Sequence, residues 1–273
     1  MKEILMQCPA KINLFLNIRG LNQKGYHELN LINQTVSLHD EICLSRGTGK
    51  LTINDPNIPN DETNSTIRAM KVFMNYIDEN VNSFDIDIKK RIPTMAGLGG
   101  ESTDAAAILI GLNILTEAYL SNEVLKKLAI QVGSDVPYFI EGGYKSVTGI
   151  GETINKIGIN PYNNYLIIKP NINNSTRNMY AILDYVTNKQ FEQKQYSGIM
   201  HNDFELIADP SIIAAKKLLL TSGAITVGMT GSGSAVVGVF EDQDNKTFEM
   251  IKSIYPTSFQ ATNSRGISIV KAS

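Results

Sequence analysis

The sequence predicts an α+β protein of two domains, and three observations support this prediction. Residues 12–18 carry isoleucine or leucine at every even position, which predicts a strand with one apolar row on a sheet face. Helical patterns follow between residues 64 and 132. After the glycine-rich stretch at 142–151, a second set of strands and helices begins. We therefore expect an N-terminal domain over 1–155 and a C-terminal domain over 156–273.

Composition and charge limit the class of protein. A chain of 273 residues is long enough for one large or two modest domains with a hydrophobic core. The net charge of −2 argues against a dedicated nucleic-acid binder, which usually presents a basic face. Cys8 and Cys43 are too few for a disulfide framework, and polar residues interrupt the apolar N-terminal patch, so it resembles neither a signal sequence nor a membrane span. We expect a cytoplasmic monomer or homodimer that acts on a small molecule, without nucleic-acid or membrane partners.

The first half of the chain alternates between strand and helix patterns. Strands are predicted at 12–18, 29–38 and 84–88, with a turn at Gly20–Gly25. Helices are predicted at 67–77, 105–115 and 122–132. Asn64 or Ser65 can cap the first helix and Ser121 the third, because short polar side chains accept hydrogen bonds from free helical N–H groups. Gly133 is expected as the C′ residue of the third helix.

The second half has its own strands and helices. Strands are predicted at 165–169, 225–229, 235–240 and 266–271, and a polar loop at 187–196. Asp209 and Pro210 form a cap and first turn for a helix through Leu220. A glycine-containing loop at 230–233 joins two of these strands, and another helix precedes the last strand.

The glycines at Gly97–Gly100 lie between a predicted strand and the start of an apolar helix. A helix start offers unpaired N–H groups and the positive end of its dipole, and glycines allow the backbone to approach an anion closely. Ser102 and Thr103 can either cap the helix or bind a magnesium ion or a phosphate oxygen. By itself the segment is about as consistent with an ordinary glycine turn as with a phosphate loop. It is neither a Walker loop nor a dinucleotide-binding motif.

Three separated segments together resemble the three signatures of the GHMP kinases, a family that includes galactokinase, homoserine kinase and mevalonate kinase. These segments are Pro9–Leu14, Gly97–Ala106 and Met229–Gly233. The resemblance implies ATP-dependent phosphorylation of a small molecule. It also implies a ribosomal-protein-like βαβ N-terminal domain, a ferredoxin-like C-terminal domain and an active site between them. Further segments resemble members of the family that act on a cytidine-bearing alcohol: 25–29, 38–42, 133–139, 149–152 and 202–205.

The resemblance assigns catalytic roles to Lys11 and Asp135. Asp135 would accept or orient the proton of the substrate hydroxyl, and Lys11 would balance its charge and stabilise the transferred phosphoryl group. Without the resemblance, Asp135 reads as a turn residue and Lys11 as a solvated charge on a strand.

The resemblance also implies a set of nucleotide-binding residues. ATP would contact Asn64, Pro93, Ala96, Gly97, Leu98, Gly99, Gly100, Glu101, Ser102 and Thr103. Asn64 could lie near the adenine, although helix capping explains this residue equally well. We expect one metal, Mg²⁺ arriving with ATP, with Ser102 as its contact.

Tyr26 and His27 match the positions that hold the cytosine in the cytidine-specific members. An aromatic ring offers a stacking face, and an imidazole can hydrogen-bond to the edge of a base. Tyr180 would supply a second aromatic ring, although ordinary core packing is about equally consistent with it. The remaining substrate contacts implied by the resemblance are Asn13, Thr176, Gly231 and Ser232.

The second signature departs from the family pattern in two ways. Met95 and Ala96 replace glycine, which is tolerable if φ stays negative there. Glu101 stands where glycine is common, and a carboxylate at a phosphate-binding helix start costs electrostatic energy. Two alternatives therefore stay open: a relative acting on another small alcohol or phosphate, and a catalytically weak protein that binds ligand as a sensor.

Overall fold

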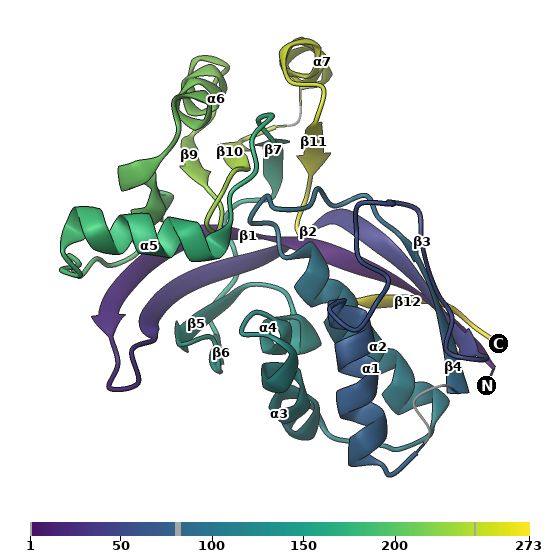
Figure 1. Ribbon diagram of the computed structural model, residues 1–273. Helices are drawn as coiled ribbons and strands as arrows, with labels where there is room; N and C mark the ends of the chain where they lie inside the picture. Colours follow the sequence, from purple (N-terminus) through teal and green to yellow (C-terminus); the bar gives the residue numbers. More distant parts are fainter. Residues whose placement is uncertain (1, 80–82, 243) are drawn as a thin grey trace.

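The computed structural model describes residues 2–79, 83–242 and 244–273, and it confirms the α+β class. Its elements form two sheets with helices on their outer faces (Figure 1). The larger sheet contains β1 (Glu3–Leu21), β2 (His27–Arg46), β3 (Leu51–Ile53), β4 (Phe84–Lys89), β5 (Lys145–Gly149), β6 (Thr153–Lys156), β8 (His201–Asn202) and β12 (Ser268–Ala272). The smaller sheet contains β7 (Asn164–Ile168), β9 (Thr226–Met229), β10 (Val236–Phe240) and β11 (Ser258–Ala261).

The long hairpin of β1 and β2 is the centre of the larger sheet. Its path runs β12-β1-β2-β4-β3, while β5 pairs with β2 and the two-residue β8 pairs in parallel with β1. The predicted strands at 12–18 and 29–38 are the middle parts of β1 and β2, which extend further in both directions than the alternation alone indicated.

The expectation that the even residues of β1 form one apolar row is wrong. The pairing of β1 with β2 shifts between Pro9 and Lys11 and again between Asn13 and Phe15. Each β-bulge inverts the pleat, so residues 10–14 present their apolar side chains to the smaller sheet, whereas the even residues before and after them join the core under the helices. The two shifts also place Lys11 and Asn13 on the opposite face from this apolar stretch.

Four helices cover one face of the larger sheet (Figure 1). They are α1 (Ser65–Tyr76), α2 (Gly100–Leu115), α3 (Asn122–Val132) and the short α4 (Val136–Glu141). Asn64 rather than Ser65 caps α1, and Ser121 caps α3 as predicted. Gly133 does end α3, but with φ of −179°, which is extended backbone that any residue can adopt, so the left-handed C′ conformation is not used.

The smaller sheet is antiparallel throughout, in the order β11-β7-β10-β9. The helices α6 (Pro210–Thr221) and α7 (Asn245–Ile254) cover its outer side, while α5 (Thr176–Thr187) lies over the β1–β2 hairpin (Figure 1). As predicted, Asp209 caps α6 by accepting a hydrogen bond from the N–H of Ser211, and Pro210 is its first residue. Buried side chains of β1, β7 and β10 form a core between the two sheets.

Two strands from beyond residue 156, β8 and β12, join the larger sheet, so the chain crosses between the sheets more than once. The division of the chain at residue 155 stays a prediction. Within the described residues, no helix has the length and apolar character needed to cross a bilayer.

Candidate functional site

A cavity of about 550 Å³ opens where the two sheets meet, beside the start of α2. Residues of β1, the glycine loop, the start of α4, the start of α5 and the loop after β9 line it. The predicted site residues that line it are Lys11, Asn13, Pro93, Ala96, Gly97, Leu98, Gly99, Gly100, Glu101, Ser102, Asp135, Thr176, Tyr180, Gly231 and Ser232. The structure therefore brings most of the predicted residues together around one space.

The amide of Asn13 joins the first signature to the third. Its Oδ1 accepts hydrogen bonds from Lys11 Nζ at 2.6 Å, from the N–H of Gly231 at 2.7 Å and from the Thr230 hydroxyl at 3.2 Å. Its Nδ2 donates to Asn33 Oδ1 at 2.6 Å. Asn13 is only 2% exposed, so its amide serves mainly to hold its neighbours in place.

The second signature packs directly against the third. Gly97 has φ of +75°, and a Cβ added to it would lie 2.1 Å from the carbonyl oxygen of Thr230. The N–H of Ala235 donates to the carbonyl of Ala96 at 3.1 Å, and the N–H of Lys11 donates to the carbonyl of Leu98 at 2.9 Å. All three signatures therefore meet through backbone contacts that leave no room for larger residues.

The glycine loop ends in the exposed N-terminus of a buried helix. Gly99, in the left-handed conformation, is the N-cap of α2. As a glycine it has no side chain that could cap the free N–H groups of the first turn. Ser102 lines the cavity beside them, whereas Thr103 is fully buried and does not. The site thus offers helical N–H groups and one hydroxyl to an anion, which is the chemistry that phosphate binding requires.

Met95 does not satisfy the condition that its φ be negative. Its φ is +51°, a left-handed conformation that costs a residue with a Cβ about 1–2 kcal/mol. This explains why glycine is usual near the front of the signature. Ala96 is not among the residues with positive φ.

Two buried carboxylates and one lysine hold the two ends of the glycine loop. Lys90 Nζ donates to Asp40 Oδ2 and, at 2.6 Å, to Asp104 Oδ2 in the first turns of α2. Asp40 Oδ1 also accepts from the N–H groups of Arg91 and Ile92. Burial raises the pKa of Asp104 to about 7, and its second oxygen has no hydrogen-bond partner within the described chain. The cluster thereby fixes the loop at residues 90–92 on one side and at residue 104 on the other.

The two predicted catalytic residues face the same cavity. Lys11 is 4% exposed, and burial lowers its pKa, an effect that the nearby negative charge of Asp135 opposes. Asp135 is the N-cap of α4, partly exposed, and its side chain does not cap that helix. A carboxylate that is free of capping is available to a substrate hydroxyl.

Glu101 lies in the first turn of α2 and lines the cavity with an exposed side chain. A second cavity, of about 100 Å³, lies next to it and is bordered by Asn64 and Asp104. Asn64 accepts from the N–H and hydroxyl of Thr66, so the capping interpretation is confirmed, and it borders this smaller space rather than the larger one.

Tyr26 and His27 lie beside the larger cavity without lining it. His27 stacks on Tyr180, with ring centroids 4.3 Å apart, and its Nε2 lies 2.7 Å from Asp184 Oδ1 of α5. Tyr180 in turn meets the edge of Phe204 and lines the cavity. Tyr26 is 59% exposed. His27 is therefore joined to the cavity through Tyr180, which both packs against other rings and lines the cavity.

Sequence reasoning missed several lining residues: Arg68, Lys90, Asn174, Ser175 and Phe204. Arg68 on α1 also donates to the carbonyl of Val132 at 2.6 Å, which ties it to the end of α3. Of these residues, Lys90 could have been found through Asp104. A charge within an otherwise apolar buried helix needs a cationic partner, and Lys90 is that partner.

Comparison with known proteins gives the family. The model of the GHMP kinase N-terminal domain matches residues 64–143, and that of the GHMP kinase C-terminal domain matches residues 192–255. The chain belongs to the GHMP kinase family. It is therefore an ATP-dependent kinase, as the three signatures indicated.

Its relatives include proteins named 4-diphosphocytidyl-2-C-methyl-D-erythritol kinase. The protein from Syntrophomonas wolfei is 33% identical over 94% of this chain and 97% of its own length. The one from Thermoanaerobacter pseudethanolicus is 33% identical over 98% and 99%. A crystal structure of 4-(cytidine 5'-diphospho)-2C-methyl-D-erythritol kinase superposes with a TM-score of 0.81 at 25% identity, covering 96% of this chain and all of that one. Homoserine kinase from Cytophaga hutchinsonii shares the fold, with a TM-score of 0.72 at 15% identity, over 99% and 98% of the two chains.

Gly97 offers a direct test of the contact between signatures. Gly97→Ala should raise the KM for ATP by about tenfold or more, because the new Cβ would collide with the Thr230 carbonyl and displace the loop. Gly223→Ala is the matched control, since Gly223 also has positive φ, +96°, but nothing lies within 4 Å of an added Cβ. Equal effects of the two variants on steady-state kinetics and melting temperature would contradict the role given to this contact.

Asp104 predicts a specific pH dependence of stability. Its pKa is about 7 in the folded chain against an ordinary value of 3.8, so the folded state holds the proton more tightly between these values. The free energy of unfolding should therefore fall as pH rises from about 4 to about 7, by up to about 1.4 kcal/mol per pH unit. Asp104→Asn should flatten this part of the profile, measured by urea unfolding at a series of pH values. Asp87→Asn, which removes an exposed carboxylate from β4, should leave it unchanged; a profile insensitive to Asp104→Asn would refute the assignment.

Proposed function

We propose that this kinase transfers the γ-phosphoryl group of ATP to the 2-hydroxyl of 4-diphosphocytidyl-2-C-methyl-D-erythritol, a step of the non-mevalonate isoprenoid pathway. One observation carries the proposal: the Lys11–Asp135 pair lies in a single cavity that has the glycine loop on one side and the His27–Tyr180 stack joined to it on the other. The names of the relatives described above support this choice of acceptor.

Each group has a distinct role in this proposal. The N–H groups at the start of α2 and Ser102 hold the ATP phosphates. Asp135 orients the acceptor hydroxyl and accepts its proton, while the Lys11 ammonium, held by Asn13, stabilises the negative charge on the transferred group. Burial of Lys11 strengthens this electrostatic contribution, because little water competes for the charge.

Mg²⁺ enters the proposal as a companion of ATP. The described residues contain no group of three His, Cys, Asp or Glu side chains suited to a metal ion. We expect the cation to be bound mainly by phosphate oxygens, with Ser102 as its protein contact. Cytoplasmic location and a monomeric or homodimeric state stay predictions from the sequence.

The decisive experiment measures ADP formation by the purified protein with ATP, Mg²⁺ and a panel of acceptors. We expect turnover with 4-diphosphocytidyl-2-C-methyl-D-erythritol and little with homoserine or mevalonate. Asp135→Asn and Lys11→Met should each lower kcat by about 10²–10⁴-fold while ATP still binds, because they remove proton acceptance or charge stabilisation only. Asp87→Asn should remain fully active. A preference for a non-nucleotide alcohol would establish a different acceptor, and an active Asp135→Asn would rule out this mechanism.

Glu101 predicts an effect on nucleotide affinity. Glu101→Gln keeps the size of the side chain and removes its charge from the phosphate-binding end of α2, so the KM for ATP should fall by about two- to fivefold. Glu123→Gln is the matched control, since Glu123 is an exposed glutamate in the first turn of α3 and does not itself line the cavity. If both variants leave the KM for ATP unchanged, the carboxylate points away from the phosphates.

A further inference from the structure

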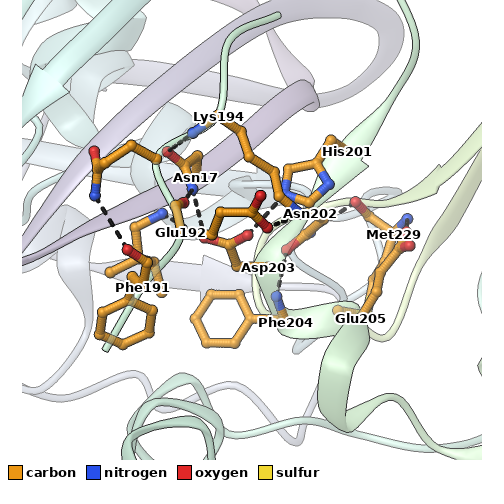
Figure 2. A network of polar contacts seen from close by, with 12 residues as sticks. Asn17, Phe191, Glu192, Lys194, His201, Asn202, Asp203, Phe204, Glu205 and Met229 are labelled. Atoms are coloured by element: carbon orange, nitrogen blue, oxygen red, sulfur yellow. Dashed lines mark hydrogen bonds and ion pairs between the residues drawn. The ribbon is translucent and has the colours of Figure 1, made fainter. Parts of the chain in front are cut away.

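Within the segment His201–Glu205, residues 202–205 resemble the family pattern, yet the proposed chemistry leaves them without a role. The segment forms β8 and the first residues of η2 (Asp203–Ile207), and Figure 2 shows Asn202 extending toward Met229 and Asp203 toward Asn17. Asn202 Nδ2 donates to the carbonyls of Met229 and Gly231, both at 2.8 Å, and Glu205 Oε1 accepts from the N–H of Met229 at 2.7 Å. Asn202 and Glu205 therefore hold the backbone of the third signature in place.

Asp203 points instead toward β1. It is 6% exposed, and its Oδ2 accepts from Asn17 Nδ2 at 2.9 Å and from the N–H of Ile18 at 2.6 Å. Its Oδ1 lies 2.7 Å from His201 Nε2. A buried carboxylate is stable only when its oxygens are bonded in this way, so Asp203 fixes the side chain of Asn17.

Asn17 also forms hydrogen bonds to the segment after α5, as Figure 2 shows. It is fully buried, and its Nδ2 also donates to the carbonyl of Glu192 at 2.8 Å while its Oδ1 accepts from the N–H of Lys194 at 3.1 Å. The amide thus uses both donors and its acceptor. Only an amide meets this pattern, since a carboxylate of the same shape has no hydrogen to donate.

The segment held by Asn17 borders the aromatic cluster. Phe191, adjacent to Glu192, meets the ring of His27 edge-on, with centroids 6.0 Å apart. On the other side, Phe204 meets Tyr180 edge-on at 4.9 Å, and Tyr180 stacks on His27. Both ends of the cluster therefore depend on residues that Asp203 and its neighbours hold.

We propose that Asn17 and Asp203 are positioning residues for the acceptor: they hold the 191–194 segment on β1, and thereby set the position of His27 and Tyr180 for a cytosine base. The inference rests on the proposed function, because it assigns the aromatic cluster to the acceptor. Neither residue lines the larger cavity, and the segment that they hold meets the aromatic cluster rather than the glycine loop, so we expect no effect of this pair on ATP binding.

The test compares KM values for the two substrates of the full-length protein. In Asn17→Asp, two donors are lost and a second carboxylate faces Asp203, so the KM for 4-diphosphocytidyl-2-C-methyl-D-erythritol should rise by about tenfold or more. The KM for ATP should stay within about twofold, which lies inside ordinary variation for a group remote from the nucleotide. Gln195→Ala is the matched control: it removes an exposed side chain next to the same segment and leaves the bonds of Asn17 in place.

Phe191→Leu gives a second, independent variant in case Asn17→Asp does not fold. It keeps an apolar side chain and removes the ring that meets His27, and it should raise the same KM selectively. If the KM values for ATP and acceptor rise together, or neither rises, the positioning role is overturned. If the unaltered protein does not phosphorylate this acceptor, the proposed function fails first and the inference fails with it.

Discussion

The geometry of the site depends on one hydrogen-bond acceptor, the side-chain oxygen of Asn13. It receives hydrogen bonds from Lys11, from the backbone of the third signature and from a threonine hydroxyl, so one atom sets the relative position of three groups at the cavity. Asn13 can do this only because two β-bulges turn residues 10–14 of β1 over with respect to the rest of the strand. Without them, Lys11 and Asn13 would face the core between the sheets, and Ile12 would face the cavity.

Local chemistry explains why so much of the fold could be predicted. The helix caps at Asn64, Ser121 and Asp209 each depend on a side chain and an N–H group two or three residues away, and the structure contains all three. The three signatures were recognised by their resemblance to a family, since the glycine loop alone is about as consistent with an ordinary turn, and the structure supplies a physical reason for one of their residues. Gly97 is glycine because the Thr230 carbonyl occupies the place of its Cβ.

What could not be predicted depends on partners distant in the sequence. The alternation at 12–18 is compatible with a flat strand, and only the pairing with β2 reveals the shifts. Nothing near Asp203 indicates that it bonds to Asn17, 186 residues earlier. Met95 adopts a left-handed conformation that a residue with a Cβ rarely takes, because the loop is held at both ends. The positions of Tyr26 and His27 relative to the cavity likewise follow from α5, whose approach is a tertiary contact.

The pairing of β12 with β1 has a consequence for synthesis on the ribosome. β1 is made long before β12, yet they are neighbours from Ile4 to Gln7. During translation this edge of the larger sheet has exposed backbone groups until β12 emerges, a state in which strand edges can pair with other chains. All five side chains of β12 are exposed, so hydrogen bonds along the backbone hold it more than burial does. The larger sheet is therefore completed only after the strands of the smaller sheet have been synthesised.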